Sequence, residues 1–168
     1  NAVEMVYDPN NSIQKVKDAL GNETVYEYDN QGNVVTEIDA EGKITKRAYD
    51  SNNNALKETI ITTESGAQGW TTTYTYDSNN NQLSRTNALG QTDYYTYDGR
   101  SNLLSSTDAL GNTTLYTYRP QGGLRSKTDA TGHITTYLYD QWGNIRQRTE
   151  GANDITSYEY DSRGNKVK

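Results

Sequence analysis

Short runs rich in Thr, Tyr, Val, Ile and Leu alternate along this chain with clusters of Asp, Asn and Gly. The runs are about six residues long, an ordinary length for a strand, and their residue types favour strands. Many of them end in Tyr-x-Tyr-Asp, as at Tyr26–Asp29, which places both tyrosines on one face of a strand. The pattern predicts about fifteen short antiparallel strands joined by tight turns, and no helix of consequence.

The last tyrosine of this motif recurs at a nearly constant interval. Successive copies are separated by 21, 21, 27, 21, 21, 21 and 21 residues. Fourteen of the fifteen tyrosines lie at this position or two residues before it, and only Tyr94 does not. A fixed period with fixed chemistry indicates a repeat protein. The recurring tyrosines are Tyr7, Tyr28, Tyr49, Tyr76, Tyr97, Tyr118, Tyr139 and Tyr160.

Each repeat holds two turn signals, and the first directly follows this tyrosine. It reads Asp-x-x-Gly or Asp-x-x-Asn, where Asp suits the start of a type I turn and Gly or Asn suits a left-handed residue. Both prolines, Pro9 and Pro120, fall at the second position of this turn. A three-residue hairpin loop with a left-handed third residue is therefore predicted. Its Asp and Gly residues include Asp8, Asp29, Gly32, Asp77, Asp98, Asp140, Gly143 and Asp161.

The second turn signal comes ten residues later, as at Asp18–Gly21. If the Asp of the first turn faces the residue four positions later, Tyr28 opposes Val34 and Tyr97 opposes Leu103. Such aromatic–aliphatic pairs stabilise one face of a sheet. If the second turn had the same loop length, the odd period of 21 residues would place successive tyrosines on opposite faces. We therefore predict that the second turn holds one more loop residue or is followed by a bulge.

One repeat departs from the period at residues 60–70, where a longer segment replaces the second turn. We expect a long inserted hairpin loop that adds about three residues to each strand and protrudes from the rim, with Trp70 at its base. Insertions in repeat proteins often carry function. A tolerated surface insertion is nevertheless the favoured interpretation.

Composition indicates a thin core. Apolar residues make up 32% of the chain, Phe and Cys are absent, and the mean hydropathy is −1.01. Regularly placed Tyr and Thr distinguish the chain from a disordered one, and Tyr rings should supply most of the burial. A sheet of so many twisted strands cannot lie flat, so we expect it to curl.

Charge and hydrophobicity exclude some partners. The net charge of −6 argues against binding to a nucleic-acid backbone. No run approaches the roughly 20 apolar residues of a membrane span. Without Cys there is no disulfide scaffold, and the compartment stays open. No signal peptide is visible, but the chain begins and ends inside a repeat, so we expect it to be a piece of a longer protein.

These motifs resemble a known repeat. Tyr28-Asp29-x-x-Gly32-Asn33, followed by Thr36-x-x-Asp39-x-x-Gly42, is similar to the tyrosine–aspartate (YD), or Rhs, repeat, and so is the segment 97–118. The resemblance covers residues 1–168 as a single array of seven repeats and part of an eighth. Its departures are Asn53 and Asn80 for Gly, Arg119 for Asp, Arg47 for the first Tyr, and Glu150–Asn153 for the second turn.

The resemblance implies a fold and a setting. Related repeats occur in bacterial polymorphic toxins, C components of insecticidal toxin complexes, wall-associated bacterial proteins and teneurins, where they wind into a hollow β-shell that can enclose a toxic polypeptide. It implies an all-β fold of tandem 21-residue repeats that form a curled, spiral sheet. The chain would be part of a shell wall in a larger secreted or surface bacterial protein, without toxin activity of its own.

The residues show no catalytic constellation. His133 is the single histidine and directly follows a turn glycine, so an exposed turn position is expected. The calcium-binding β-roll and EF-hand patterns are both absent. The repeated aspartates are better explained as caps of their own turns. We therefore expect no enzyme activity, no cofactor and no metal.

Two functional hypotheses follow. The leading one is a structural repeat module, because a binding site rarely needs every repeat equally. The runner-up is an adhesion or carbohydrate-binding module that uses the Tyr-rich face, with Tyr116, or the hairpin around Trp70, since aromatic rings pack on sugar faces. Besides contacts with neighbouring repeats, open sheet edges predict edge-to-edge or face-to-face self-association.

Overall fold

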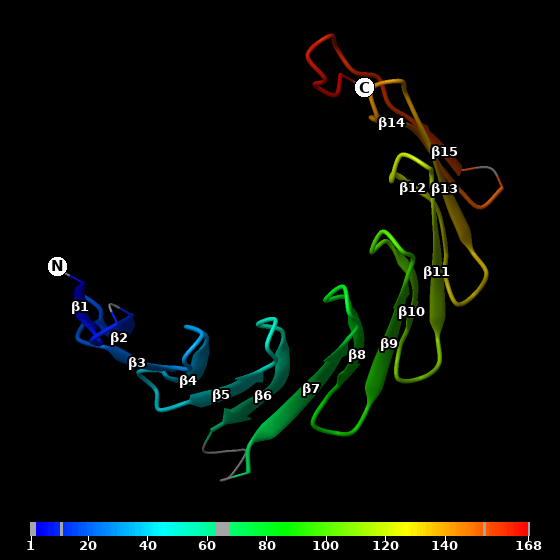
Figure 1. The fold of residues 1–168 in the computed structure, drawn as a ribbon. Coiled ribbons are helices and arrows are strands. Elements are labelled where there is room, and N and C mark those ends of the chain that lie inside the picture. The colour runs from blue at the N-terminus through cyan, green and yellow to red at the C-terminus, as the bar shows by residue number, and fades with distance from the viewer. Residues whose placement is uncertain (1–2, 11, 63–67, 153, 168) are drawn as a thin grey trace. The chain divides into compact units, whose positions relative to one another are not determined.

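The computed structural model describes residues 3–10, 12–62, 68–152 and 154–167. These ranges contain fifteen strands and no helix, and the strands follow one another in sequence order within an antiparallel sheet (Figure 1). The all-β fold of short tandem strands predicted from the sequence is confirmed. The strands are β1 (Glu4–Tyr7), β2 (Ile13–Lys17), β3 (Glu23–Tyr28), β4 (Val34–Ile38), β5 (Ile44–Tyr49), β6 (Ala55–Ile61), β7 (Trp70–Tyr76), β8 (Gln82–Thr86), β9 (Thr92–Tyr97), β10 (Leu103–Thr107), β11 (Thr113–Tyr118), β12 (Leu124–Thr128), β13 (Ile134–Tyr139), β14 (Ile145–Glu150) and β15 (Asp154–Ser157).

The chain divides into two compact units, residues 1–92 and 93–168, and both are built from the same hairpins. Three expectations fall partly outside the described residues: the left-handed residue at Asn11, the altered second turn at Asn153, and the middle of the insertion, residues 63–67. In the described part of the insertion, β6 and β7 continue by one pair, Ile60 with Trp70.

All first turns with a described loop close in one way, as the turn after Tyr28 illustrates. The Asp29 amide donates to the Asn33 carbonyl at 2.9 Å, and the Gly32 amide donates to the Asp29 carbonyl at 3.2 Å. Gly32 has a φ of 87°, and where the chain has Asn or Ser at this position, φ is 62° to 64°. The predicted three-residue loop with a left-handed third residue is confirmed.

The second turns that begin at Asp18, Asp39, Asn87, Asp108 and Asp129 close in the same way as the first turns, which contradicts the sequence prediction. The Asp18 amide donates to the Asn22 carbonyl at 2.9 Å, and the Gly21 amide donates to the Asp18 carbonyl at 3.0 Å. These loops therefore hold no extra residue. No bulge follows the turn in β2–β3, β4–β5, β10–β11 or β12–β13, because the pairs in these hairpins are regular. The prediction that the second turn differs by one residue is wrong.

The extra residue lies instead in the strand that follows the first turn. In the β3–β4 hairpin, Tyr28 opposes Val34 but Glu27 opposes Thr36, which leaves Val35 unpaired as a bulge. One unpaired residue per repeat is what an odd period requires to keep the tyrosines on one face. The same shift occurs in all seven first-turn hairpins with a described register. The unpaired residues are Gln14, Val35, Leu56, Leu83, Leu104, Arg125 and Arg146.

In five repeats the last tyrosine of the motif connects neighbouring repeats. A regular second-turn hairpin has only three pairs, so the carbonyl of Ile13 lies beyond the end of the β2–β3 ladder. The Tyr28 hydroxyl donates to this carbonyl at 2.7 Å. Three other tyrosines donate to the carbonyl fifteen residues earlier: Tyr49, Tyr139 and Tyr160. Tyr76 makes the equivalent bond to Ala55 across the insertion.

The core is as thin as the composition indicates. Among the described residues no apolar side chain is buried, and the buried polar residues are Thr45 and Thr135, at 5% and 8% exposure. The tyrosine face is half-buried in most repeats. Burial raises the pKa of Tyr28 and Tyr118 above the ordinary value, and a neighbouring Tyr adds to the effect. The opposite face carries cross-strand hydroxyl pairs, for example Thr96 with Ser105 at 2.6 Å.

We predict that Tyr139→Phe lowers the free energy of unfolding by about 1 kcal/mol, because the Leu124 carbonyl loses its donor while the ring stays in place. The hydroxyl donates to that carbonyl at 2.7 Å. Tyr94→Phe is the matched control, since the Tyr94 side chain is on the opposite face and 57% exposed. Urea denaturation of both variants gives the comparison. Equal effects would contradict a role for the hydroxyl in joining repeats.

Candidate functional site

The aspartates of the repeated motif are engaged by their own turns. Asp29 Oδ1 accepts the amides of Gln31 and Asn33, both at 2.9 Å, and Oδ2 accepts the Asn33 side-chain amide at 3.0 Å. The Asn33 side chain, followed by the backbone amides, holds the pKa of Asp29 below its ordinary value. In the part of the chain that the structure describes, no three His, Cys, Asp or Glu side chains are grouped to hold a metal. The aspartate of the motif therefore stabilises its own turn.

Arg119 departs from the motif together with Gly123. Its guanidinium carbon lies 3.7 Å from the centre of the Tyr139 ring in the next repeat. A Cβ at position 123 would lie 2.7 Å from Arg119 Nη2, so the usual Asn would displace the guanidinium. The backbone hydrogen bond that closes this turn is unchanged, since the Arg119 amide still donates to the Gly123 carbonyl at 2.8 Å. A contact between repeats has here replaced the Asp–Asn cap.

We predict that Gly123→Asn alone lowers the free energy of unfolding by about 1 kcal/mol, because the guanidinium loses its contact with Tyr139. The double variant Arg119→Asp, Gly123→Asn restores the usual Asp–Asn pair and should be at least as stable as the parent. Urea denaturation of the parent, both single variants and the double variant gives the coupling. Strictly additive effects would show that the two positions are independent.

Arg47 replaces the first tyrosine of its motif and forms an ion-pair network instead. It lies on β5 between two carboxylates, at 3.0 Å from Glu58 on β6 and 3.2 Å from Glu37 on β4. Partial burial disfavours the charge of Arg47, but the hydrogen bonds to Glu58 and Glu37 outweigh it and raise the pKa of the guanidinium. The Arg47 side chain therefore cross-links three strands, and its charge is already paired with the two carboxylates.

The two candidate binding residues lie in different units. Trp70 begins β7 at the base of the insertion, is 45% exposed, and lines a cavity of about 590 Å³ with Thr71, Thr86 and Asn87. Tyr116 is half-buried in β11, where it opposes Lys127, and it lines none of the three described cavities. His133 is exposed, and its backbone amide donates to Asp129 Oδ1.

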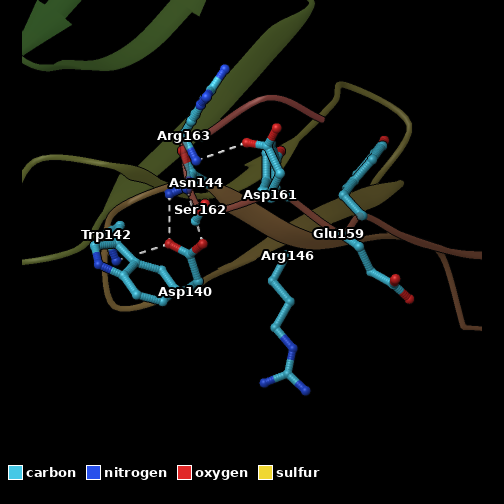
Figure 2. A pocket seen from close by; sticks show the side chains of 11 residues that line it. Asp140, Trp142, Asn144, Arg146, Glu159, Asp161, Ser162 and Arg163 are labelled. Atoms are coloured by element: carbon cyan, nitrogen blue, oxygen red, sulfur yellow. Dashed lines mark hydrogen bonds between the residues drawn. The ribbon is translucent and has the colours of Figure 1, made fainter. Parts of the chain in front are cut away.

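A larger groove, of about 730 Å³, lies near the end of the second unit and was missed by the sequence analysis. Two successive first turns form it, Asp140–Asn144 and Asp161–Gly164, together with Arg146 and the segment 158–160. Figure 2 shows Trp142 at one side of this groove and Glu159 at the other. The sequence does hold a signal for this site, because Trp142 occupies a loop position that is polar in the other first turns.

The sheet of tandem hairpins, with its capped turns and tyrosine bridges, defines a β-repeat protein. The RHS repeat family model matches residues 7–44 and 49–92, and the same 21-residue motif continues to the end of the chain. The predicted resemblance to the YD-repeat, or Rhs-repeat, family is confirmed over these two segments.

One solved structure shares this fold. A chain of the Photorhabdus luminescens Tc holotoxin pore aligns over 98% of this chain, with a TM-score of 0.53 and 14% identity. This chain spans only 13% of that one, and at such identity the likeness shows the fold alone. A TcdB2–TccC3–Cdc42 crystal structure also aligns over 98% of the chain, at 15% identity and a TM-score of 0.34, and 14% of its own chain is covered.

No curated protein sequence matches the chain significantly. Within the described residues, the structure has no helix that is long and apolar enough to cross a membrane.

Proposed function

We propose that this chain is a structural, non-catalytic module that forms part of a β-shell wall in a larger secreted or surface bacterial protein. The carrying observation is that the repeated groups are already engaged in the structure itself. The Asp29 carboxylate is bonded within its own turn, and the Tyr28 hydroxyl is bonded to the preceding repeat. A unit that repeats its internal contacts in this way is suited to extending a sheet.

The neighbouring repeats of the parent protein are the partners that this proposal requires. A solved structure with the shared fold is a Tc holotoxin pore, and this chain corresponds to 13% of the length of the chain that it matches. We propose that the wall in the parent protein encloses a polypeptide, as the family resemblance implies. The sheet would then act as a container, with its chemistry supplied by other segments.

Cryo-electron microscopy of the protein as the organism produces it tests this proposal. The expected result is a continuous β-wall around an internal volume, with the hairpins of residues 1–168 in that wall. A reconstruction in which this segment is an isolated sheet with solvent on both faces would overturn it.

A second candidate function is carbohydrate binding at the insertion. It is favoured by one observation, namely that Trp70 is 45% exposed and lines a cavity with hydroxyl and amide side chains. A glycan array probed with the parent, Trp70→Ala and Tyr116→Ala tests it. Binding that is lost in Trp70→Ala would support the insertion as the site, and loss in Tyr116→Ala would indicate the tyrosine face. The absence of binding would remove this candidate.

Edge-to-edge self-association is a further proposal. β1 and β15 end the strand order, and every residue in both strands is exposed. Such edges present unpaired backbone groups to other chains. Light scattering over a range of concentrations tests the proposal, and a monodisperse monomer at the highest concentration would contradict it.

A further inference from the structure

Trp142 is aromatic at a position where the fold does not require it. It is the second loop residue of its first turn, and the seven equivalent residues are all Asn, Gln or Arg. Its side chain is 78% exposed, so the indole contributes little to packing. An exposed indole offers an apolar face on which an external ligand can pack.

The turn holds Trp142 in a fixed backbone geometry. The Trp142 amide donates to Asp140 Oδ1 at 2.9 Å, and the Asn144 amide donates to the same oxygen at 2.9 Å (Figure 2). The Asn144 side chain donates to Asp140 Oδ2 at 3.0 Å. Because the backbone is already ordered, a ligand that packs on the indole need not order this loop.

The groove beside the indole has the size of a ligand site. Its volume of about 730 Å³ lies within the range of about 300–1,000 Å³ that is common for small-molecule sites. Its lining comes entirely from residues 140–164, within the second unit. The Arg163 amide donates to Asp161 Oδ1 at 2.9 Å, so the second wall of the groove is also formed by a capped turn.

The charges around the groove favour a neutral ligand. Arg146 and Arg163 line the groove together with carboxylates at Asp140, Glu159 and Asp161, so a polymer of either charge would meet like charges. In Figure 2 the side chains of Arg146 and Arg163 point in opposite directions. They therefore do not converge into the two-pronged clamp that binds a carboxylate or phosphate. Mixed donors and acceptors instead suit hydroxyl groups.

We propose that this groove binds a neutral oligosaccharide, with one sugar ring stacked on Trp142 and its hydroxyls bonded to the polar lining. Aliphatic C–H groups on a sugar face pack against an indole, while the donor and acceptor positions that the turns leave open bind the hydroxyls. The site is separate from Trp70. It does not depend on the shell-wall proposal, because a wall segment and an independent module could both carry it.

Tryptophan fluorescence can test this site directly. The chain has two tryptophans, so Trp70→Gln leaves Trp142 as the only indole reporter. This variant is titrated with neutral β-1,4-linked hexamers of N-acetylglucosamine, glucose and mannose, each up to millimolar concentration. Hexagalacturonate and hexaglutamate are titrated in parallel as anionic probes. The expected result is a saturable change in emission with at least one neutral hexamer.

Calorimetry with the same hexamer then compares Trp142→Gln with the parent. Glutamine stands at the equivalent positions Gln31 and Gln121, so this turn should still form, and circular dichroism checks it. We expect Trp142→Gln to bind at least about tenfold more weakly, while Trp70→Gln binds like the parent. The proposal is overturned by no saturation with any neutral hexamer, by equal affinity in Trp142→Gln, or by binding of the anionic probes alone.

Discussion

Gly69→Ala should lower the free energy of unfolding by about 3 kcal/mol, because two separate penalties meet at this residue. Gly69 has a φ of +66°, which disfavours any residue with a Cβ. A Cβ there would also lie 2.6 Å from the Ile60 carbonyl oxygen and 2.8 Å from Ile61 Cγ1. The Ile60 carbonyl oxygen belongs to the backbone of β6, and Ile60 pairs with Trp70. This oxygen therefore cannot move without shifting the base of the hairpin.

The matched control for this prediction is Gly32→Asn. Gly32 also has a positive φ, of 87°, but a Cβ there would meet nothing within 4 Å. The chain itself places Asn at the equivalent positions Asn53 and Asn80, each with a φ of 64°. Gly32→Asn should therefore change the stability by less than about 1 kcal/mol. Urea denaturation measures both variants, and similar losses in the two would contradict the steric explanation.

Acid should unfold this protein through its turn caps. Ten turn aspartates have a pKa below the ordinary value of 3.8. At Asp108 the causes are hydrogen bonds from the Asn112 side chain and then from its backbone amide. Since the folded state holds these protons less tightly than the unfolded state does, their contribution is complete above the unfolded pKa. It is lost as the pH falls through the folded values.

Thermal unfolding between pH 2 and pH 11 measures this dependence. The midpoint should be constant from about pH 5 to pH 9 and fall steeply below about pH 4. A second decline is expected above about pH 10, because burial raises the pKa of Tyr28 and Tyr118 and the unfolded chain then ionises first. A midpoint that is unchanged between pH 5 and pH 2 would show that the caps do not contribute.

A single substitution can separate this effect from general acid repulsion. Asn87 caps its turn without a titrating group, and its Oδ1 accepts the amides of Leu89 at 3.0 Å and Gln91 at 3.1 Å. Asp108→Asn copies that cap into the following repeat, which has the same Ala-Leu-Gly loop. The variant should lose less stability between pH 7 and pH 3 than the parent does. An identical loss in both proteins would exclude Asp108 as a contributor.

The hairpins were predictable because their causes act over a few residues. Asp at the start and Gly or Asn at the end define the loop, so the pairs Tyr28–Val34 and Tyr97–Leu103 follow from counting alone. The odd period likewise required one unpaired residue in each repeat. Parity could not say which hairpin would carry it, since a bulge in either one restores the tyrosine face. The structure places it after the first turn, as at Val35.

The candidate sites were also predictable only where the signal lies within a short stretch of sequence. The sequence singled out Trp70 because an insertion marked it, and the structure does place Trp70 beside a cavity. It gave no reason to connect Trp142 with Tyr158 and Arg163, which meet only when two successive first turns come together. Tyr116 was chosen from the regular row of tyrosines, and it lines none of the three cavities described above.

By itself the sequence determined the repeat, the positions of the two turns, the tyrosine–aliphatic pairs and the resemblance to the YD-repeat family. These depend on backbone chemistry and on parity within about ten residues. Only the tertiary structure decided the position of the bulge, the Tyr28 bond to Ile13, the stacking of Arg119 on Tyr139 and the groove beside Trp142. Each of these joins residues at least fifteen positions apart, or chooses between registers with equal parity, so the packing of neighbouring repeats sets it.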